Sequence, residues 1–362
     1  MRLPILEGDS AKIDEPLATK MIRTAIDAGV NYVDTAWPYH KEQSEPFVGR
    51  CLQDGYRDKV KLATKMPSWL IKEEADFDKH LNIQLERLQT DHIDFYLLHA
   101  LNKTFWPNLR DLGVFEWAEK AIASGRIRHL GFSFHDKASL FTEIVDAYDW
   151  TFCQIMYNYM DTDFQAGQAG LRYAASKDIA VVVMEPLRGG SLTQPAPDPV
   201  ADLWDTAQTK RSQADWALQW LWNQPEVSLL LSGMSEMQHV EQNLLSANNS
   251  GVGTLNAEEV DLVDRVSKAY RALSPIPCTD CKYCMPCPSG VLIPNIFSTY
   301  NGFKMYGDEA AAKRSYNQFM KPENRADQCV ECGQCEQACP QQIEIIDWLK
   351  KAHAFLVETP AS

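Results

Sequence analysis

Eight of the ten cysteines lie in two short runs near the end of the chain, and their spacing constrains this region strongly. Within each run the cysteines are separated by two residues, except that the last interval of the second run is three. A proline follows the last cysteine of each run. Such a cluster in a chain that starts without an apolar secretion signal indicates metal binding rather than disulfide bonds. The runs are Cys278, Cys281, Cys284 and Cys287, and Cys329, Cys332, Cys335 and Cys339.

This pattern resembles that of bacterial ferredoxins, which hold two [4Fe–4S] clusters. Three cysteines at this spacing let one turn present three thiolates to a cluster, and the cysteine before proline reaches the other cluster. Two zinc sites fit less well, because zinc gives no reason for a third cysteine at the same spacing. We therefore expect one cluster on Cys278, Cys281, Cys284 and Cys339, and the other on Cys329, Cys332, Cys335 and Cys287.

The proline-rich segment before the first cysteine run indicates a domain boundary. Between the two runs, apolar residues such as Ile296, Tyr300 and Phe303 recur at near-helical intervals, which predicts a small, mainly helical domain. A chain of 362 residues is long enough for one large core and a small appended domain. We expect a large domain over residues 1–273 and a ferredoxin-like domain over residues 274–362.

The large domain alternates short β-branched or aromatic runs with amphipathic segments. Successive runs end 31 to 34 residues apart over the first half of the chain. A strand–helix unit that repeats at this interval predicts an α/β fold, the parallel (β/α)8 or TIM barrel, with its N-terminal strand truncated to a tail at residues 1–4. The seven expected strands are Asn31–Asp34, Lys61–Lys65, Ile93–His99, Leu130–Ser133, Phe152–Tyr157, Ile179–Glu185 and Ser228–Gly233.

Chemically useful residues close four successive runs: Asp34, Lys65, His99 and Ser133. In a TIM barrel the carboxyl ends of the strands and the loops that follow them form the active-site face. A polar residue at the end of a strand is also common as a helix cap, so any one of them alone would indicate little. Together they predict an active site at these strand ends.

At these residues the chain resembles the aldo-keto reductases, over roughly residues 1–250. The segment NYVDTAWPY contains Asp34 and Tyr39, KLATK contains Lys65, and DFYLLH contains His99. One branch of that family carries a C-terminal domain with two clusters, and both halves of this chain are similar to it. The resemblance implies a nicotinamide-dependent oxidoreductase that reduces a small-molecule carbonyl, or oxidises an alcohol, with the clusters relaying electrons.

The resemblance implies a role for each of the four residues. Tyr39 is the expected general acid, although a free phenol with a pKa near ~10 gives up its proton poorly at neutral pH. Lys65 is expected to lower that pKa, and Asp34 to hold the ammonium in place. His99 is expected to hydrogen-bond the carbonyl oxygen. A buried ion pair and a core histidine are the purely structural alternatives.

The same resemblance implies that NAD(P)(H) lies across the strand ends, since no Rossmann or phosphate-loop motif is present. Phe134 stands where the family usually has asparagine, Met184 where an aromatic ring stacks on nicotinamide, and Gly233 and His239 where basic residues bind a 2′-phosphate. The choice between NAD and NADP therefore stays open. The residues expected to bind the cofactor are Ser133, Gln154, Pro186, Leu187, Arg188, Gly189, Ser232 and Asn243.

Three tryptophans, Trp37, Trp69 and Trp106, follow strands on the expected active-site face. Aromatic side chains dominate protein cores as well as binding sites, so both a substrate pocket and plain packing are open for them.

Composition excludes two classes of partner. The net charge of −14 argues against nucleic-acid binding, and no apolar run approaches the ~18 residues that a membrane span needs, so we expect a cytoplasmic protein. A hydride carries two electrons and each cluster passes one, so a one-electron carrier protein is a possible partner. Two alternatives remain: a reductase whose clusters are structural, and an electron-transfer or scaffold protein whose barrel no longer binds nicotinamide.

Overall fold

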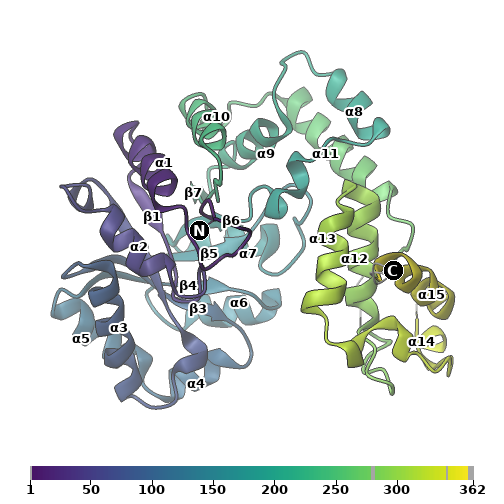
Figure 1. Cartoon of the computed structure of the whole chain (residues 1–362), viewed down its shortest axis with the longest axis horizontal. Helices are drawn as coiled ribbons and strands as arrows, with labels where there is room; N and C mark the ends of the chain where they lie inside the picture. Colours follow the sequence, from purple (N-terminus) through teal and green to yellow (C-terminus); the bar gives the residue numbers. More distant parts are fainter. Residues whose placement is uncertain (1, 279–281, 340, 358–362) are drawn as a thin grey trace. The chain divides into compact units, whose positions relative to one another are not determined.

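The computed structural model describes residues 2–278, 282–339 and 341–357. Its first unit is built on one sheet of parallel strands (Figure 1). Buried β-branched and aromatic residues form these strands, as the sequence predicts. The strands are β1 (Tyr32–Asp34), β2 (Lys61–Met66), β3 (Ile93–Leu101), β4 (Ile127–Phe134), β5 (Phe152–Met156), β6 (Ala180–Met184) and β7 (Val227–Leu230).

The strand order follows the chain from β1 to β7, and every neighbouring pair is parallel. The expected α/β fold with seven parallel strands is thus confirmed, and β1 and β7 are the two edges of the sheet. In a parallel sheet all carboxyl ends lie at one edge of the layer, so the residues that follow the strands meet on one face.

Residues 2–4 do not form a strand, so the prediction that they are the tail of a strand is wrong. These residues nevertheless contact the segments that follow both edge strands, β1 and β7. The N–H of Leu3 donates to Nε2 of His40, which lies in the loop after β1, at 3.2 Å. The side chain of Arg2 packs against Gly233 beyond β7, where a Cβ atom would lie 3.0 Å from it. Backbone pairing in this segment is limited to one isolated bridge between Ile5 and Ile13 in the described residues.

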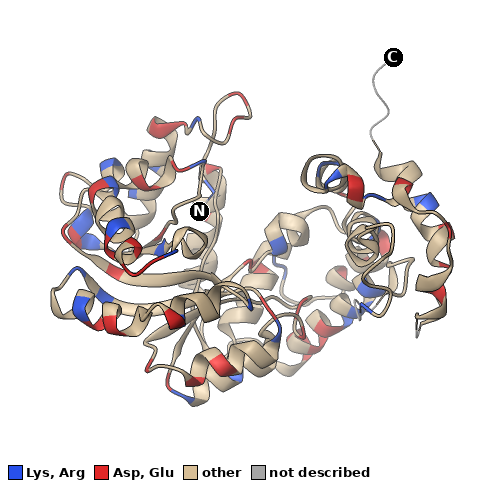
Figure 2. Ribbon diagram, turned by 90° about the horizontal axis from the view of Figure 1, so that it is seen from below, with Lys and Arg blue, Asp and Glu red and all other residues tan. Residues whose placement is uncertain are grey.

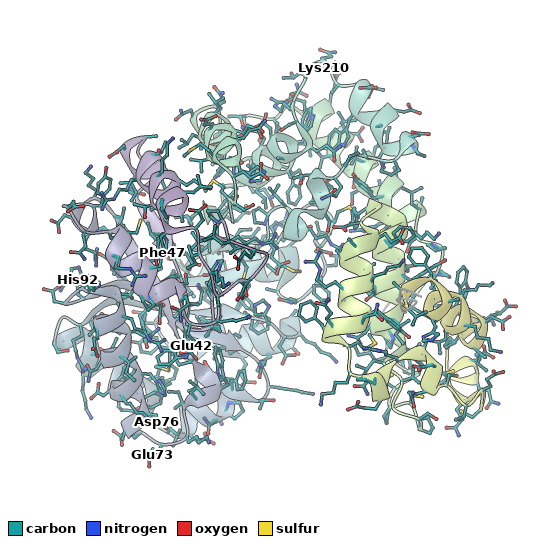
Figure 3. The ribbon with its side chains drawn as sticks, in the orientation of Figure 1. Glu42, Phe47, Glu73, Asp76, His92 and Lys210 are labelled. Atoms are coloured by element: carbon teal, nitrogen blue, oxygen red, sulfur yellow. The ribbon has the colours of Figure 1, made fainter. Side chains whose placement is uncertain are left out.

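Helices cover the outside of this sheet, and their apolar faces pack on it. In the third helix Phe77, Leu81 and Leu88 are buried at helical spacing, and the helix ends where Gln89 adopts a left-handed backbone. Phe47 on the second helix, labelled in Figure 3, is also buried. The helices are α1 (Glu15–Asp27), α2 (Ser44–Cys51), α3 (Ala75–Leu88), α4 (Phe105–Asp111), α5 (Val114–Ala123), α6 (Ala138–Asp146), α7 (Gly167–Ser176), α9 (Gln213–Trp222) and α10 (Met237–Asn248).

The second unit is helical, as predicted, and is assembled from two parts of the chain, residues 189–213 and the chain from residue 257 onward. The first unit comprises residues up to 188 and residues 214–256, and the domain boundary expected at residue 273 stays a prediction. Arg211 pairs with Glu259 at 2.6 Å and joins the two parts. The helices are α8 (Asp198–Asp205), α11 (Ala257–Ala272), α12 (Ile293–Tyr306), α13 (Glu309–Arg314), α14 (Gln334–Gln337) and α15 (Ile345–Leu356), with a π-helical turn at Ser315–Phe319.

Charged residues of both signs are interspersed along the helices of each unit (Figure 2). Within the part of the chain that the structure describes, no helix is both long and apolar enough to span a bilayer.

Candidate active site and candidate cluster sites

The four predicted catalytic residues come from neighbouring elements of the first unit. Asp34 is the last residue of β1, Lys65 lies near the end of β2 and His99 near the end of β3. Tyr39 lies in the loop between β1 and α2, where its N–H donates to the carbonyl of Ala36. The parallel strands bring Asp34, Lys65 and His99 to the carboxyl edge of the sheet, and the loop after β1 brings Tyr39 to the same edge.

Lys65 is the centre of this group, and its side chain is fully buried. Its Nζ donates to Oδ2 of Asp34 at 2.6 Å and to the backbone carbonyl of Thr35 at 2.8 Å. It also lies 5.1 Å from the ring centroid of Tyr39. Burial acts to lower the pKa of Lys65, but Asp34 and Tyr39 raise it by more, so the lysine is an ammonium at neutral pH.

The phenol of Tyr39 has a net pKa above its ordinary value of 10.0. Lys65 is the largest single influence and lowers this pKa, as the sequence predicts. Burial, Asp34 and Glu185 together outweigh it, because each of them disfavours the phenolate. The influence of Lys65 thus has the predicted direction, and burial together with the two carboxylates reverses it in sum. At neutral pH Tyr39 is protonated and can donate a proton.

His99 is neutral in this site. Burial, together with the nearby Lys65 ammonium, holds the pKa of His99 well below 6.5. Its ring lies 6.2 Å from that of Tyr39 at an angle of 83° and 5.3 Å from that of Trp69. The Nδ1 atom is buried with no hydrogen-bond partner in the described structure. A neutral imidazole in this position can offer one N–H to a substrate oxygen.

One of the three tryptophans lies beside the candidate site, and the other two are packed in the protein interior. Trp69 is 36% exposed and lies beside His99, so it belongs to the open site. Trp37 is buried under the guanidinium of Arg87, which lies 3.9 Å from its ring centroid. Trp106 is buried and its Nε1 donates to Glu143 at 2.9 Å. Two of the three are therefore packing residues.

Ser133 and Gln154 lie side by side on β4 and β5, where the parallel register pairs them. The hydroxyl of Ser133 accepts a hydrogen bond from the N–H of Ala100 at 2.8 Å, and its own proton is left to donate. Gln154 donates from Nε2 to the sulfur of Met184 at 3.4 Å, while its Oε1 is buried without a partner in the described structure. A buried amide oxygen in need of a donor fits the carboxamide of a nicotinamide.

The segment after β6 has an unusual backbone. Arg188, Gly189 and the neighbouring Gly190 have φ angles of 49°, 69° and 101°, a left-handed run of the kind that can form an anion-binding concavity. The guanidinium of Arg188 is tied to Asp161 at 2.9 Å. Pro186, Leu187 and Arg188 end the first stretch of the barrel unit, and Gly189 begins the second unit.

Beyond β7, the side chain of Asn243 on α10 donates to Oγ of Ser232 at 3.0 Å, so these two predicted residues are brought together. Two of the departures from the family pattern have structural explanations. Phe134 is buried and packs edge-on against Phe141 at 5.1 Å, so it belongs to the core. Gly233 leaves room for the side chain of Arg2.

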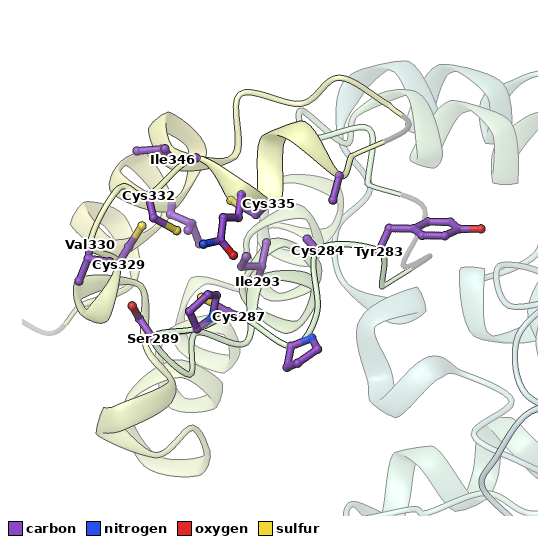
Figure 4. Close-up of a pocket in the computed structure, with 16 residues that line it drawn as sticks. Tyr283, Cys284, Cys287, Ser289, Ile293, Cys329, Val330, Cys332, Cys335 and Ile346 are labelled. Atoms are coloured by element: carbon purple, nitrogen blue, oxygen red, sulfur yellow. The ribbon is translucent and has the colours of Figure 1, made fainter.

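In the second unit, cysteines of both runs line two cavities, and the crossed assignment of ligands stays a prediction. Figure 4 shows the first cavity, of about 170 Å³. Its wall contains Cys287 from the first run together with Cys329, Cys332 and Cys335 from the second, and also Cys284. The second cavity is lined by Cys278 and Cys284 together with Cys339 from the second run. Cys281 lies outside the described residues. Thiolates that converge on one space are the donor set that an iron–sulfur cluster needs.

One group of residues behind the site was missed from the sequence. Glu45, Thr64, Gln84 and Arg87 form a buried polar cluster directly behind Lys65. The available signal was Gln84, a polar residue between the buried Leu81 and Leu88 on the inner face of α3.

With this geometry established, comparison with known proteins decides the family. Residues 5–268 match the sequence model of the Aldo/keto reductase family, and residues 277–344 match that of the 4Fe-4S dicluster domain. The chain belongs to the aldo/keto reductase family. Its second unit is the iron–sulfur type of domain that the cysteine runs predict.

Curated relatives of this aldo/keto reductase match parts of it. The aldo-keto reductase YhdN of Bacillus subtilis is 31% identical over 193 residues, which are 50% of this chain and 55% of YhdN. The methylglyoxal reductase YeaE of Escherichia coli is 35% identical over 123 residues, 33% of this chain and 39% of YeaE. The chain thus spans about half or less of the length of these two relatives.

Solved structures share the fold. An aldo-keto reductase of Bacillus halodurans has a TM-score of 0.61 and 24% identity, and the match covers 74% of this chain and 92% of that one. An aldo-keto reductase of Klebsiella pneumoniae in complex with NADPH has a TM-score of 0.58 and 25% identity, with coverage of 70% and 85%.

Proposed function

We propose that this protein reduces a small-molecule carbonyl with a nicotinamide dinucleotide. The observation that carries the proposal is Lys65, a buried ammonium held by Asp34 at 2.6 Å and facing the phenol of Tyr39. A structural ion pair would need no phenol and no neutral histidine beside it. Here both are present, and the partly exposed ring of Trp69 lies beside the histidine.

The chain's own residues handle the proton. Tyr39 is protonated at neutral pH, so it can donate to the oxygen of the carbonyl as that oxygen gains negative charge. The Lys65 ammonium stabilises the phenolate that remains, and Asp34 keeps the ammonium aimed at it. His99, being neutral, can hydrogen-bond the same oxygen.

A nicotinamide dinucleotide, when bound, supplies the hydride that adds to the carbonyl carbon. Gln154 and Ser133 would orient its carboxamide, and the left-handed backbone from Arg188 to Gly190 would lie against its phosphates. Further along the nucleotide, Ser232 and Asn243 would make the remaining contacts. The residues of this proposed site are Ser133, Gln154, Pro186, Leu187, Arg188, Gly189, Ser232 and Asn243. The Klebsiella neighbour binds NADPH, which supports this class of cofactor without fixing NAD or NADP.

We further propose that the second unit holds two [4Fe–4S] clusters. Their ligands would be Cys278, Cys281, Cys284 and Cys339 for one and Cys287, Cys329, Cys332 and Cys335 for the other, in agreement with the lining of the two cavities. Bound clusters exchange single electrons, so a one-electron carrier protein is the partner that we infer. A structural role is the second candidate, because most of these cysteines pack against the core of the unit.

The test uses anaerobically purified holoprotein and methylglyoxal, the substrate class named for one relative. NADH and NADPH oxidation is followed in the wild type and in Tyr39→Phe, together with the visible absorbance of the clusters. We expect turnover in the wild type, its loss in Tyr39→Phe, and equal cluster absorbance. Normal turnover in Tyr39→Phe would refute the catalytic assignment. Cluster removal separates the two roles: unchanged turnover with a less stable second unit would favour structural clusters.

A further inference from the structure

Glu45, on the first turn of α2, is a carboxylate with no exposed surface. Its Oε1 accepts hydrogen bonds from the hydroxyl of Thr64 at 2.6 Å and from Nε2 of Gln84 at 2.5 Å. Its Oε2 lies 3.3 Å from Nη1 of Arg87. Burial is the main effect and raises the pKa of Glu45, while these three donors oppose it. A buried carboxylate is costly, so its donors must be well placed to retain it.

Gln84 links Glu45 to the catalytic lysine by hydrogen bonds. Besides Glu45, its Nε2 donates to the backbone carbonyl of Lys65 at 3.0 Å. Its Oε1 accepts from the hydroxyl of Tyr96 at 2.7 Å, so the amide is held in one orientation from both sides. The direction of the Lys65 side chain depends on the backbone of its own residue, and Gln84 fixes that backbone from behind.

Arg87 links Glu45 to the loop that contains the catalytic tyrosine. Its Nη2 pairs with Glu42 at 2.7 Å, and its guanidinium lies 3.9 Å from the ring centroid of Trp37. Figure 3 labels Glu42. Trp37 and Glu42 lie on either side of Tyr39 in the loop, so Arg87 fastens both ends of the segment that presents the phenol.

We propose that Glu45 is a positioning residue, which sets the phenol of Tyr39 against the ammonium of Lys65 by holding Gln84 and Arg87 in place. The inference deepens the proposed function and rests on it. It also accounts for a charge in the core at this point: Arg87 and Gln84 both need an acceptor here, and one carboxylate serves both. Close packing supports the link, since a Cβ atom on Gly49 of α2 would lie 2.5 Å from the carbonyl of Arg87.

The test compares Glu45→Gln with Asp94→Asn. Asp94 is the matched control, since it is also buried and paired with an arginine, Arg57 at 2.8 Å, but it lies at the start of β3, five residues before His99. With methylglyoxal and NADPH, we expect Glu45→Gln to lower kcat about tenfold and to change KM less than about twofold, because alignment and not binding is lost. Asp94→Asn should lose stability and keep kcat.

A second readout needs no turnover. The pKa of Tyr39 is measured by NMR on protein with 13C-labelled tyrosine, with its signal assigned by its absence in Tyr39→Phe. Glu45→Gln should raise this pKa, because Lys65 no longer faces the phenol as closely, and Asp94→Asn should not. If the wild type reduces no carbonyl, the proposed function fails and this titration alone decides the inference.

If Glu45→Gln does not fold, Gln84→Met tests the proposal in its place. This variant removes the donor to the carbonyl of Lys65 and keeps the ion pair between Glu45 and Arg87. We expect Gln84→Met to lower kcat and to raise the pKa of Tyr39, as Glu45→Gln should. Unchanged kcat and an unchanged pKa of Tyr39 in the folded variant would overturn the proposal. An equal loss of kcat in Asp94→Asn would do so as well, since the effect would then be general destabilisation.

Discussion

The ammonium of Lys65 lies 2.6 Å from the carboxylate of Asp34, and the lysine side chain has no exposed surface. Removing one partner of such a pair leaves the other charge buried and unpaired, which costs about 3–5 kcal/mol. The pair therefore holds the lysine in one place. It also fixes the end of β2 against the end of β1, where the candidate site lies.

Asp34→Asn is predicted to lower kcat by about 10²-fold, because the ammonium loses its anchor and its alignment with Tyr39. KM for the carbonyl should change little. Steady-state kinetics with methylglyoxal checks this, with Asp27→Asn, an exposed aspartate of α1, as the control. A kcat within twofold of the wild type in Asp34→Asn would show that the lysine needs no anchor.

Protonation of His99 should not limit the reaction near its ordinary pKa. Burial keeps the imidazole neutral, so kcat should show no limb attributable to His99 between about pH 6 and 8. The folded protein disfavours the imidazolium, so this residue makes stability fall as pH falls below 6.5. His99→Gln, which keeps an N–H donor, should retain more activity than His99→Ala. Equal pH–rate profiles and a smaller acid sensitivity of unfolding in His99→Gln are the expected results.

Asp94, at the start of β3, predicts a loss of stability in the same direction as His99 but at lower pH. Burial raises its pKa, but the N–H of Leu62 and the guanidinium of Arg57 lower it by more. A lowered folded pKa gives stability that is present above the unfolded pKa near ~3.9 and is lost as pH falls through the folded value.

Asp94→Asn should therefore cost about 3 kcal/mol in free energy of unfolding at pH 7 and much less near pH 3. Urea unfolding of both proteins at the two pH values measures the difference. A cost that stays the same at pH 3 would mean that the hydrogen bond to Leu62, and not the charge of Asp94, stabilises the protein.

The crossed arrangement of the cysteines can be tested by combining variants. Cys339→Ser alone should remove about half of the iron, because it releases one of two clusters. Adding Cys281→Ser should remove little more, since both belong to the same proposed cluster, whereas adding Cys332→Ser should remove nearly all. Iron and sulfide counts with electron paramagnetic resonance give the answer. If the two double variants lose equal iron, the ligands are not crossed as proposed.

Periodicity and local spacing predicted what depends on short stretches of chain. The seven parallel strands, the position of Asp34, Lys65 and His99 at strand ends and the convergence of the cysteine runs follow from residues close in sequence. The resemblance added Tyr39, which no pattern of alternation would single out.

The rest depends on contacts between distant residues. Glu185 and Asp34 raise the pKa of Tyr39 against the influence of Lys65, and only the folded chain brings Glu185 near it. Glu45 and Arg87 look like ordinary surface residues of two helices, yet they are paired behind the site. Trp37 and Trp106 looked equivalent to Trp69 and are packing residues, because their burial depends on Arg87 and Glu143.

Isotope transfer tests the central claim most directly. The holoprotein is incubated with methylglyoxal and NADPH or NADH deuterated at the transferable position of the ring, and the alcohol is analysed by mass spectrometry and NMR. We predict one deuterium on the new carbinol carbon with the wild type and none with Tyr39→Phe, at equal cluster content. An alcohol formed without deuterium at that carbon, with either nucleotide, would contradict hydride transfer at the Tyr39–Lys65 site.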